Sequence, residues 1–580
     1  MEYDVLIRGA NIVDGTGRPA FSGDVGIRGD HIVDVGELGG RIASRTIDAG
    51  GLTLTPGFVD IHTHYDGQAS WDSQLAPSSM NGVTSVGMGN CGVGFAPARP
   101  SWHDRLIGIL EGVEDIPGTA LAEGLTWDWQ SFPEYLDALD RRSFTIDVGA
   151  HMPHAALRVF VMGDRGADHT QAPTDAEIAE MERLTLEAVE AGAMGFSTSR
   201  TWAHRDSNGV SINTLTAAGR ELAGPARALR RAGRGVFQLV SDVYNTTQDE
   251  LVAGELALIE DVARLCGRPL SFSLMQSNQA PRRYRELLDY AQKLAGDGLD
   301  VRCQVAPRGV GVIIGLRTTL NPFCALPSYR TLGADPVGRV QSLRDSGMRE
   351  RLLAEARRGE FDHPSAELMR KYEMMFRMSD PVDYEPDPAR SIAAEAAASG
   401  RDVLDYLYDV LLEEDGRRLL YMPALNYSDG DLDAVFEMMT ADNTLFGLSD
   451  GGAHCGTICD ASFPTTTLAL WSRGSRNGHR KPIEWLVHGY TQRNARHVGW
   501  FDRGVIAPGH RADINLIDLD ALALPPPELH YDLPAGGLRL MQQPRGYHMT
   551  LKNGVTTFDR GKWTGAMPGG LLRGEQRSAL

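Results

Sequence analysis

The feature that most constrains this chain is a pair of histidines at the end of an apolar stretch. Residues 52–61 are apolar and β-prone, and they run from a Gly-Gly pair to His62 and His64. This pattern predicts a short buried strand. Because alternate residues of a strand point to the same side, the two imidazoles should project in one direction from its end. Neutral imidazole is a common ligand of zinc and related ions, so the pair predicts half of a metal site, although such a pair alone also occurs by chance.

The long middle of the chain, residues 56–500, alternates strand-like and helical patterns, which favours a parallel sheet wrapped by helices. One helix is clearly marked. Thr174 and Glu177 have the spacing of a capping box, and apolar residues then recur at helical intervals up to Ala191. We therefore expect an α/β fold with a (β/α)8 TIM-like barrel, whose reactive groups lie at the C-terminal strand ends.

The two ends of the chain share a different pattern. Residues 1–55 and 501–580 contain short strand-like segments separated by glycine-rich turns, one of them at Asn553-Gly554. Two β segments that flank one long middle predict a small composite β-sandwich domain formed by both termini.

Residues 335–420 interrupt the alternation of the barrel, because they are charged, helix-prone and broken by prolines. We expect a helical insertion here. Four methionines and a phenylalanine cluster inside it, and Met is common on adaptable apolar surfaces. A lid over an acyl-binding pocket is one interpretation; ordinary helix packing is the other and is favoured.

Composition excludes several classes of protein. The 580 residues are 42% hydrophobic and 23% charged, as in a soluble globular chain with one large domain and a smaller one. The formal net charge of −19 argues against nucleic acid or an anionic membrane as a partner. No apolar run approaches the roughly 20 residues that span a bilayer, and the first residues lack the pattern of a signal peptide. Six cysteines do not make a disulfide framework. We expect a cytoplasmic protein.

Several glycine- and aspartate-rich stretches occur in one order along nearly the whole chain. Together with the His-x-His motif, this arrangement resembles the amidohydrolase superfamily, and more narrowly its branch of D-aminoacylases and N-acyl-amino-acid deacylases. The stretches that carry the resemblance are residues 3–15, 24–30, 47–51, 504–509 and 512–515.

The resemblance assigns roles to two further residues. In that branch, an aspartate at the end of the last barrel strand binds metal and takes a proton from the attacking water, and Asp450 matches this position. A metal lowers the pKa of bound water to about 7, and a carboxylate beside that water can carry its proton to the leaving nitrogen. A cysteine at the second strand end also binds metal in the branch, and Cys91 matches it; thiolate suits zinc. Alone, Asp450 would be interpreted as a turn residue, but beside His62 and His64 a catalytic role is favoured. For Cys91, a metal ligand and a small buried residue are equally open before the resemblance favours the ligand.

The chain departs from the family in one respect. The family normally supplies two more histidines at the ends of the fifth and sixth strands, but residues 235–242 and 269–276 contain none. The second metal site, which Cys91 would share with those histidines, therefore lacks its nitrogen ligands. We expect one zinc ion per chain, with two as the alternative. The expected ligands are His62, His64 and Asp450, with Cys91 nearby.

Other side chains are weaker candidates for the site. Oxygen ligands or hydrogen bonds could come from Gln238, Gln276 or Asp242, and Cys455 and Cys459 have a spacing that also suits a metal clip, although loop packing is favoured. The resemblance and the strand ends suggest four substrate-binding residues. These are His154, Ser197, Arg200 and His204; a structural role is equally open for His154, and His204 could instead stabilise an oxyanion or complete a metal shell.

The resulting functional hypothesis is an enzyme that hydrolyses the linear amide bond of N-acyl amino acids, D or L and with a long acyl chain among the options, through a metal-activated water. One alternative is a cyclic-amide hydrolase of the hydantoinase or dihydroorotase kind, although those relatives usually carry a metal-bridging lysine where Cys91 lies. Another is a non-catalytic scaffold of the same fold. The expected partner is a small-molecule substrate, and the resemblance implies a homo-oligomer.

Overall fold

The centre of the protein is a barrel of parallel strands. The computed structural model describes residues 2–333, 335–361 and 367–578. Eight strands pair in the order in which they follow one another along the chain, each parallel to the next. They are β6 (Phe58–Asp60), β7 (Val83–Met88), β8 (Asp147–Pro153), β9 (Gly195–Arg200), β10 (Val236–Ser241), β11 (Leu270–Leu274), β12 (Val301–Val305) and β16 (Thr444–Phe446).

The barrel closes just beyond the C-terminal ends of its first and last strands. Thr63 and Gly451 form a parallel bridge, and the N–H of His64 donates to the carbonyl of Gly451 at 2.8 Å. This contact joins the segment after β6 to the segment after β16. The predicted (β/α)8 barrel is therefore confirmed, and its closure lies beside the two histidines.

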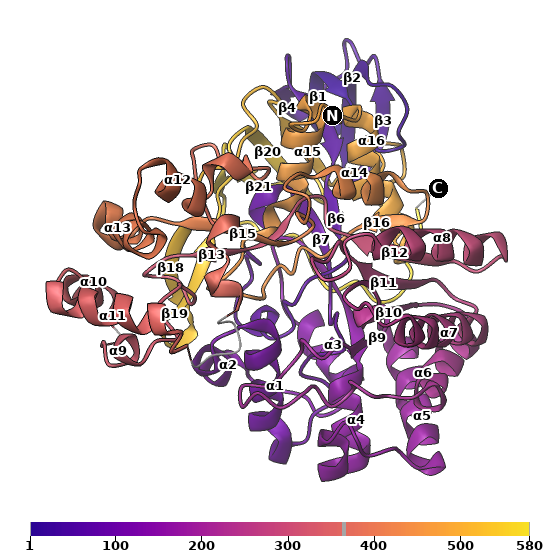
Figure 1. Cartoon of the computed structure of the whole chain (residues 1–580). Coiled ribbons are helices and arrows are strands. Elements are labelled where there is room, and N and C mark those ends of the chain that lie inside the picture. The colour runs from indigo at the N-terminus through magenta and orange to yellow at the C-terminus, as the bar shows by residue number, and fades with distance from the viewer. Residues whose placement is uncertain (1, 334, 362–366, 579–580) are drawn as a thin grey trace.

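Helices surround the barrel (Figure 1). The helix predicted from the capping box is α5, in which the Thr174 side chain accepts from the N–H of Glu177 and Glu177 bonds back to Thr174; it ends at Gly192, whose φ is 115°. None of the helices within the described residues is both long and apolar enough to cross a membrane. The surrounding helices are α1 (His103–Glu114), α2 (Gly118–Gly124), α3 (Phe132–Asp140), α4 (His154–Met162), α5 (Asp175–Ala191), α6 (Gly219–Ala232), α7 (Asp249–Cys266), α8 (Arg283–Gly296), α14 (Asp433–Thr440), α15 (Phe463–Arg473), α16 (Ile483–His488) and α17 (Asn494–His497).

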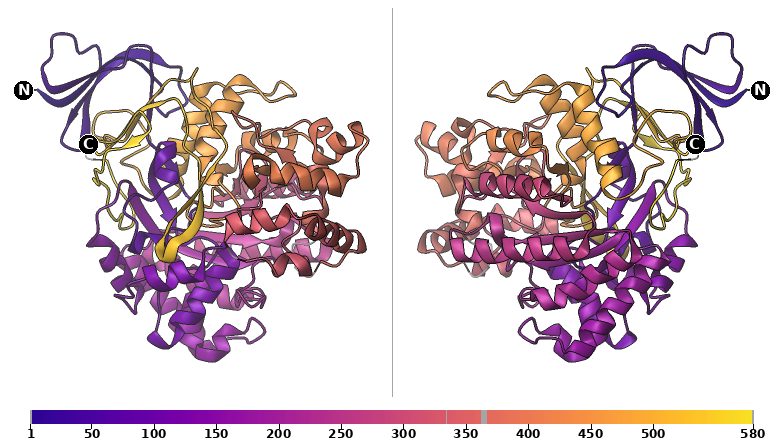
Figure 2. Two further views of the ribbon diagram at one scale, coloured as in Figure 1. Left: turned by 90° about the vertical axis from the view of Figure 1, so that its left-hand side faces the viewer. Right: turned by 90° about the vertical axis from the view of Figure 1, so that its right-hand side faces the viewer.

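The second β unit is built from both ends of the chain, as the sequence predicts. Its sheet has the order β22-β21-β20-β17-β5-β1-β2-β3, with β4 paired to β1. Figures 1 and 2 show the indigo N-terminal and yellow C-terminal strands together at one end of the molecule. The strands are β1 (Tyr3–Ile12), β2 (Phe21–Arg28), β3 (His31–Gly36), β4 (Ala43–Asp48), β5 (Thr53–Pro56), β17 (Ile514–Ile517), β20 (Tyr547–Lys552), β21 (Val555–Asp559) and β22 (Lys562–Trp563); β18 (Glu528–Leu533) and β19 (Gly537–Met541) form a separate hairpin.

The apolar stretch before the histidines is not one strand but two. β5 belongs to the composite sheet, whereas β6 begins the barrel, and the chain passes from one to the other at Gly57. A Cβ at Gly57 would lie 2.2 Å from the Thr84 hydroxyl, so only glycine fits where the two sheets meet. The prediction of a single strand over residues 52–61 is therefore wrong, because uninterrupted burial hides a change of sheet.

A helical unit is inserted between β12 and α14. It contains a small sheet and a hydrophobic core of its own, and Met369 and Met375 are fully buried in that core. This packing favours the second interpretation of the methionine cluster. Residues 334 and 362–366 of this region lie outside the described residues. The inserted elements are β13 (Val310–Ile314), α9 (Pro327–Arg330), α10 (Pro336–Leu343), α11 (Ser346–Arg358), β14 (Phe376–Arg377), α12 (Ile392–Ala398), α13 (Val403–Gly416) and β15 (Leu420–Leu425).

A buried ionic cluster joins the barrel to the composite sheet. Lys552 Nζ, on β20, lies 2.7 Å from Asp147 on β8 and 2.9 Å from Asp513. Arg503 Nη1 lies 2.5 Å from the same Asp147 carboxylate, and its Nε lies 2.8 Å from Asp502. All five side chains are buried, so they fix the two units against each other.

Candidate metal centre

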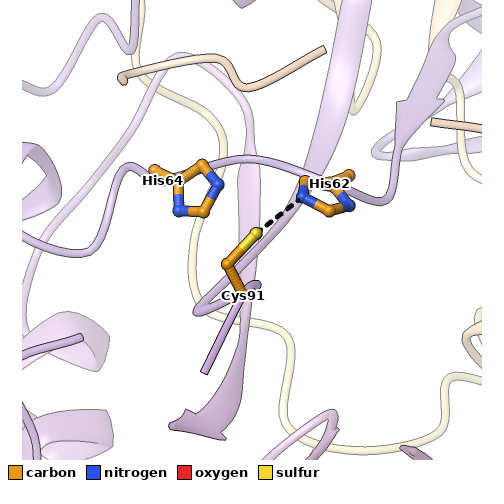
Figure 3. Close-up of side chains that lie close together, drawn as sticks. All are labelled: His62, His64 and Cys91. Atoms are coloured by element: carbon orange, nitrogen blue, oxygen red, sulfur yellow. Dashed lines mark hydrogen bonds between the residues drawn. The ribbon is translucent and has the colours of Figure 1, made fainter. Parts of the chain in front are cut away.

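His62 and His64 lie on either side of the residue that closes the barrel. Both imidazoles are buried, and their ring centroids are 5.6 Å apart. Nε2 of His62 lies 3.3 Å and Nε2 of His64 lies 3.5 Å from the same oxygen, Oδ1 of Asp450. Figure 3 shows the two rings converging on the thiol of Cys91. The two ends of the barrel sheet thus bring both histidines to one carboxylate.

Cys91 enters the cluster from a tight turn after β7. Its φ is +56°, and a Cβ on the next residue, Gly92, would lie 2.8 Å from the Cα of Thr198. The turn is held from strand β10, because Oε1 of Gln238 accepts from the Cys91 N–H at 3.1 Å. Sγ of Cys91 lies 3.3 Å from Nε2 of His62. A strained non-glycine residue at such a place is typical of functional sites.

Asp450 follows the last barrel strand in a similarly unusual conformation. Leu448 and Asp450 have φ values of +60° and +47°. Between them, the hydroxyl of Ser449 donates to the buried carboxylate of Asp60 at 2.5 Å, which ties the last strand end to the first. The Asp450 side chain is 23% exposed, whereas His62 and His64 are closed off from solvent, so the centre opens on the side of the aspartate.

A second set of side chains orients the two imidazoles. Nδ1 of His62 lies 2.6 Å from Oε1 of Gln304, whose amide nitrogen donates to the Ser271 hydroxyl at 2.9 Å. Nδ1 of His64 lies 3.3 Å from Oε1 of Glu114. The amide oxygen of Gln304 can only accept, so the His62 ring carries hydrogen on Nδ1 and directs the Nε2 lone pair into the cluster. The contact of Glu114 with Nδ1 of His64 brings two opposite charges together without hydrogen-bond geometry.

The four candidate ligands differ in how their surroundings shift their pKa values. Burial lowers the pKa of His62 to about 4, which keeps its Nε2 lone pair free at neutral pH. Burial opposes the charge on Asp450, but its contact with His64 and the charges of both histidines hold its pKa well below the ordinary value. Burial raises the pKa of the Cys91 thiol to about 12. Burial would lower the pKa of His64, but Glu114 and Cys91 raise it well above the ordinary value.

These residues fit a zinc ion. The ligand atoms of His62, His64 and Cys91 all lie within 4.8 Å of one another. A tetrahedral centre with bonds of about 2.0–2.3 Å separates its ligands by roughly 3.3–3.7 Å. The contact of His62 with Cys91, at 3.3 Å, and those of Asp450 with the two histidines, at 3.3 and 3.5 Å, fall in this range. Neither ring nitrogen of His64 has a hydrogen-bond partner within the described residues. A buried imidazole in that state indicates a missing ligand.

The four substrate-binding candidates fall in different environments. His154 is fully buried, with Nδ1 at 2.8 Å from the Thr198 hydroxyl and Nε2 at 3.2 Å from Glu221, so both nitrogens are engaged away from the cluster. The Ser197 hydroxyl is also buried, and it accepts from the Gly92 N–H at 3.1 Å beside Cys91.

Arg200 and His204 lie beyond the end of β9. The guanidinium of Arg200 is occupied by Glu255, with Nε at 2.9 and 3.0 Å from the two carboxylate oxygens. Nδ1 of His204 lies 2.9 Å from the Ser199 hydroxyl. Burial and the charges of His454 and His64 together lower the pKa of His204 to about 3. His204 is therefore close enough to His64 and His454 to be affected by their charges, whereas the charge of Arg200 is neutralised by Glu255.

The candidate oxygen ligands are engaged elsewhere. Gln276 donates to Asp429 at 2.9 Å, and its backbone N–H donates to Asn426 at 2.6 Å. Asp242 accepts from the Thr201 hydroxyl at 2.6 Å. A cavity of about 460 Å³ lies over the ends of β9 and β10; Arg200, Trp202, Asp242 and Glu255 are among its lining residues.

Sequence reasoning missed two residues of the centre, Glu114 and Gln304. Glu114 shares the buried face of α1 with Leu106 and Leu110, at intervals of four residues. The sequence could have indicated Glu114, because a carboxylate occurs there at a position where the helical spacing predicts an apolar residue. Gln304 lies inside the otherwise buried strand β12, where an amide needs a partner.

The fold is a closed (β/α)8 barrel, and a candidate metal site lies at the C-terminal ends of its strands. These features define the class of protein. The family model named amidohydrolase family matches residues 45–363 and 381–558, so the chain belongs to the amidohydrolase family.

Individual relatives agree with this assignment. The D-aminoacylase of Alcaligenes xylosoxydans xylosoxydans is 35% identical over 196 residues, which is 34% of this chain and 37% of that protein. The matched part thus spans little more than a third of that relative. An uncharacterized protein of Mycobacterium tuberculosis is 28% identical over 539 residues, 89% of this chain and 84% of its own.

Two solved structures share the fold. A crystal structure of D-aminoacylase superposes with a TM-score of 0.64 at 22% identity, over 98% of this chain and 100% of that one. The N-acyl-D-glutamate deacylase of Bordetella bronchiseptica, solved with zinc and a phosphonate inhibitor, gives 0.64 at 24% identity over 99% and 100%. The likeness extends across the barrel and the additional β sheets.

Proposed function

We propose that the protein is a zinc-dependent hydrolase that cleaves the linear amide bond of N-acyl amino acids. One observation carries the proposal: the donor atoms of His62, His64 and Cys91 lie within 4.8 Å of one another at the C-terminal ends of the barrel strands, and Oδ1 of Asp450 lies 3.3 and 3.5 Å from Nε2 of the two histidines. The relatives named as D-aminoacylase and N-acyl-D-glutamate deacylase support the substrate class.

The residues of this chain would have the following roles in the reaction. When bound, the metal supplies a water molecule of lowered pKa and polarises the amide carbonyl. Asp450 is ionised and is the more open of the donors, so its Oδ1 can take the proton of that water and deliver it to the leaving nitrogen. The two imidazoles are held with Nε2 inward and need not move.

We propose a single metal ion per chain. β10 and β11 offer glutamine and serine side chains in place of histidine, and Oε1 of Gln238 is already engaged by the Cys91 N–H. His204, which lies beyond the end of β9 and is affected by the charges of His64 and His454, is the proposed contact for the substrate. Acyl-chain length and the choice between D and L substrates depend on the surfaces around this residue.

The test is elemental analysis of the purified protein combined with a substrate panel. About one zinc per chain, with hydrolysis of N-acyl amino acids that is lost on chelation and restored by zinc, supports the proposal. Hydrolysis of hydantoins or dihydropyrimidines instead would show that the substrates are cyclic amides. A protein that retains no metal under mild purification and hydrolyses neither class would be a scaffold, which contradicts the proposal.

A further inference from the structure

Glu114 is a buried carboxylate that touches two histidines. It ends helix α1 and is 2% exposed; Oε1 lies 3.3 Å from Nδ1 of His64, and Oε2 lies 3.7 Å from Nε2 of His454. A carboxylate is costly to bury unless it is paired. Its position between two imidazoles therefore indicates a role beyond packing.

The same residue holds the loop that carries Asp450. The carbonyl of Glu114 accepts from the N–H of His454, and the neighbouring Asp115 accepts from the Thr457 hydroxyl at 3.0 Å. Asp115, Asp450 and His454 all have φ values of +47° or +48°, a conformation that residues other than glycine rarely adopt. The helix end and the strained loop thus support each other.

The contact with His64 also decides which ring nitrogen is available. The Glu114 carboxylate lies beside Nδ1 of His64, which favours a hydrogen on that nitrogen and leaves Nε2, 3.5 Å from Asp450, directed at the cluster. Gln304 does the same for His62. Partners of this kind usually hold the ring of a metal-bound histidine in place.

We propose that Glu114 is a positioning residue for the metal centre: it fixes His64 with Nε2 inward and couples that ring to the loop of Asp450 and His454. This inference rests on the proposed function, since it requires His64 to bind a metal. It adds a residue outside the ligand set whose loss should weaken metal binding without removing a ligand.

The experiment is a titration of the metal-free protein with cobalt(II), followed by its visible absorption, in the absence of substrate. We expect Glu114→Gln, which retains an acceptor but no charge, to weaken cobalt binding by about 10-fold, and Glu114→Ala by about 100-fold. Glu111→Gln is the matched control, because Glu111 is exposed on the same helix and binds only the Gly118 N–H. It should bind cobalt as the wild type does.

A second variant separates positioning from folding. In a His64→Ala background, Glu114→Gln should cause no further loss of affinity, because the ring it orients is gone. Equal cobalt affinity of Glu114→Gln, Glu114→Ala and wild type, or an undiminished further loss in the His64→Ala background, would overturn the inference. Wild-type protein that binds cobalt but hydrolyses no N-acyl amino acid would contradict the proposed substrate class and leave the role of Glu114 standing.

Discussion

Nδ1 of His62, just after the first barrel strand, lies 2.6 Å from Oε1 of Gln304 on the seventh. The contact crosses the barrel interior and is anchored by the hydrogen bond from Gln304 to Ser271 at 2.9 Å. A strand that contributes no metal ligand therefore determines how one of the ligands is presented.

Replacing Gln304 by Leu should weaken metal binding about 10- to 100-fold, because the His62 ring loses the acceptor that fixes its hydrogen on Nδ1. Competition with a chelator measures the effect. Gln292→Leu, at an exposed position of α8, is the control and should leave the affinity unchanged. Unaltered affinity in Gln304→Leu would show that the ring is oriented without this amide.

Asp450→Asn should lower kcat about 10²- to 10⁴-fold, because an amide cannot accept the proton that the carboxylate takes. Metal should still bind, less tightly, since the other three donors remain. Steady-state kinetics at saturating zinc separates the two effects. Asp442→Asn, at an exposed residue before the same strand, should retain full activity; wild-type kcat in Asp450→Asn would exclude the proton-transfer role.

Metal affinity should rise with pH. Burial raises the pKa of the Cys91 thiol to about 12, so between pH 6 and 8 the metal must displace a proton from it. The raised pKa of His64, which Glu114 and Cys91 increase against the effect of burial, adds a second proton, whereas His62, with a pKa of about 4, adds none. Affinity should therefore increase about 10- to 100-fold per pH unit.

Cys91→Ala tests how much of the increase in metal affinity per pH unit comes from the thiol. Without the thiol, one proton fewer is displaced, so the rise per pH unit should fall by about 10-fold. Affinities from chelator competition at four or five pH values would show this directly. An identical slope in the variant would mean that the thiol is not a ligand.

Lys552→Met should destabilise the protein by about 3–5 kcal/mol, because Asp147 and Asp513 would be left buried without a full set of positive partners. The midpoint of urea unfolding reports the loss. Lys562→Met, at an exposed position of β22, is the control and should change the stability by less than about 0.5 kcal/mol. Equal midpoints for both variants would show that Arg503 alone satisfies the cluster.

His154→Ala tests whether this histidine serves the fold or the substrate. Since both its nitrogens bind other side chains, we expect a lower thermal midpoint and an unchanged KM. His530→Ala, at an exposed position of β18, should alter neither quantity. A raised KM with an unchanged thermal midpoint would indicate that His154 binds the substrate.

Much of the fold could be predicted because local patterns determine it. The capping box at Thr174 and the turn at Asn553-Gly554 carry their own signals, and the structure has α5 and the β20–β21 hairpin there. The split at Gly57 could not be predicted, since hydrophobic runs show burial but not which sheet a strand joins.

The candidate metal site also has a part that the sequence could predict and a part that it could not. His62 and His64 are two positions apart in sequence, so their common direction could be predicted from strand geometry alone. Glu114 and Gln304 reach them from a distant helix and strand, and only the closed barrel brings those atoms together. Long-range partners of a site depend on tertiary packing, which a single sequence does not display.

The composite β sheet, which combines strands from both ends of the chain, also determines which part of the structure is completed last. β5 lies between β1 and β17, and the N–H of Gly57, just before the strand that leads to His62, donates to the carbonyl of Asp513 at 2.8 Å. During synthesis on the ribosome, residues 514–559 emerge after the whole barrel. The first barrel strand, and with it the histidine pair, thus gains its final support from a segment that is made after the barrel.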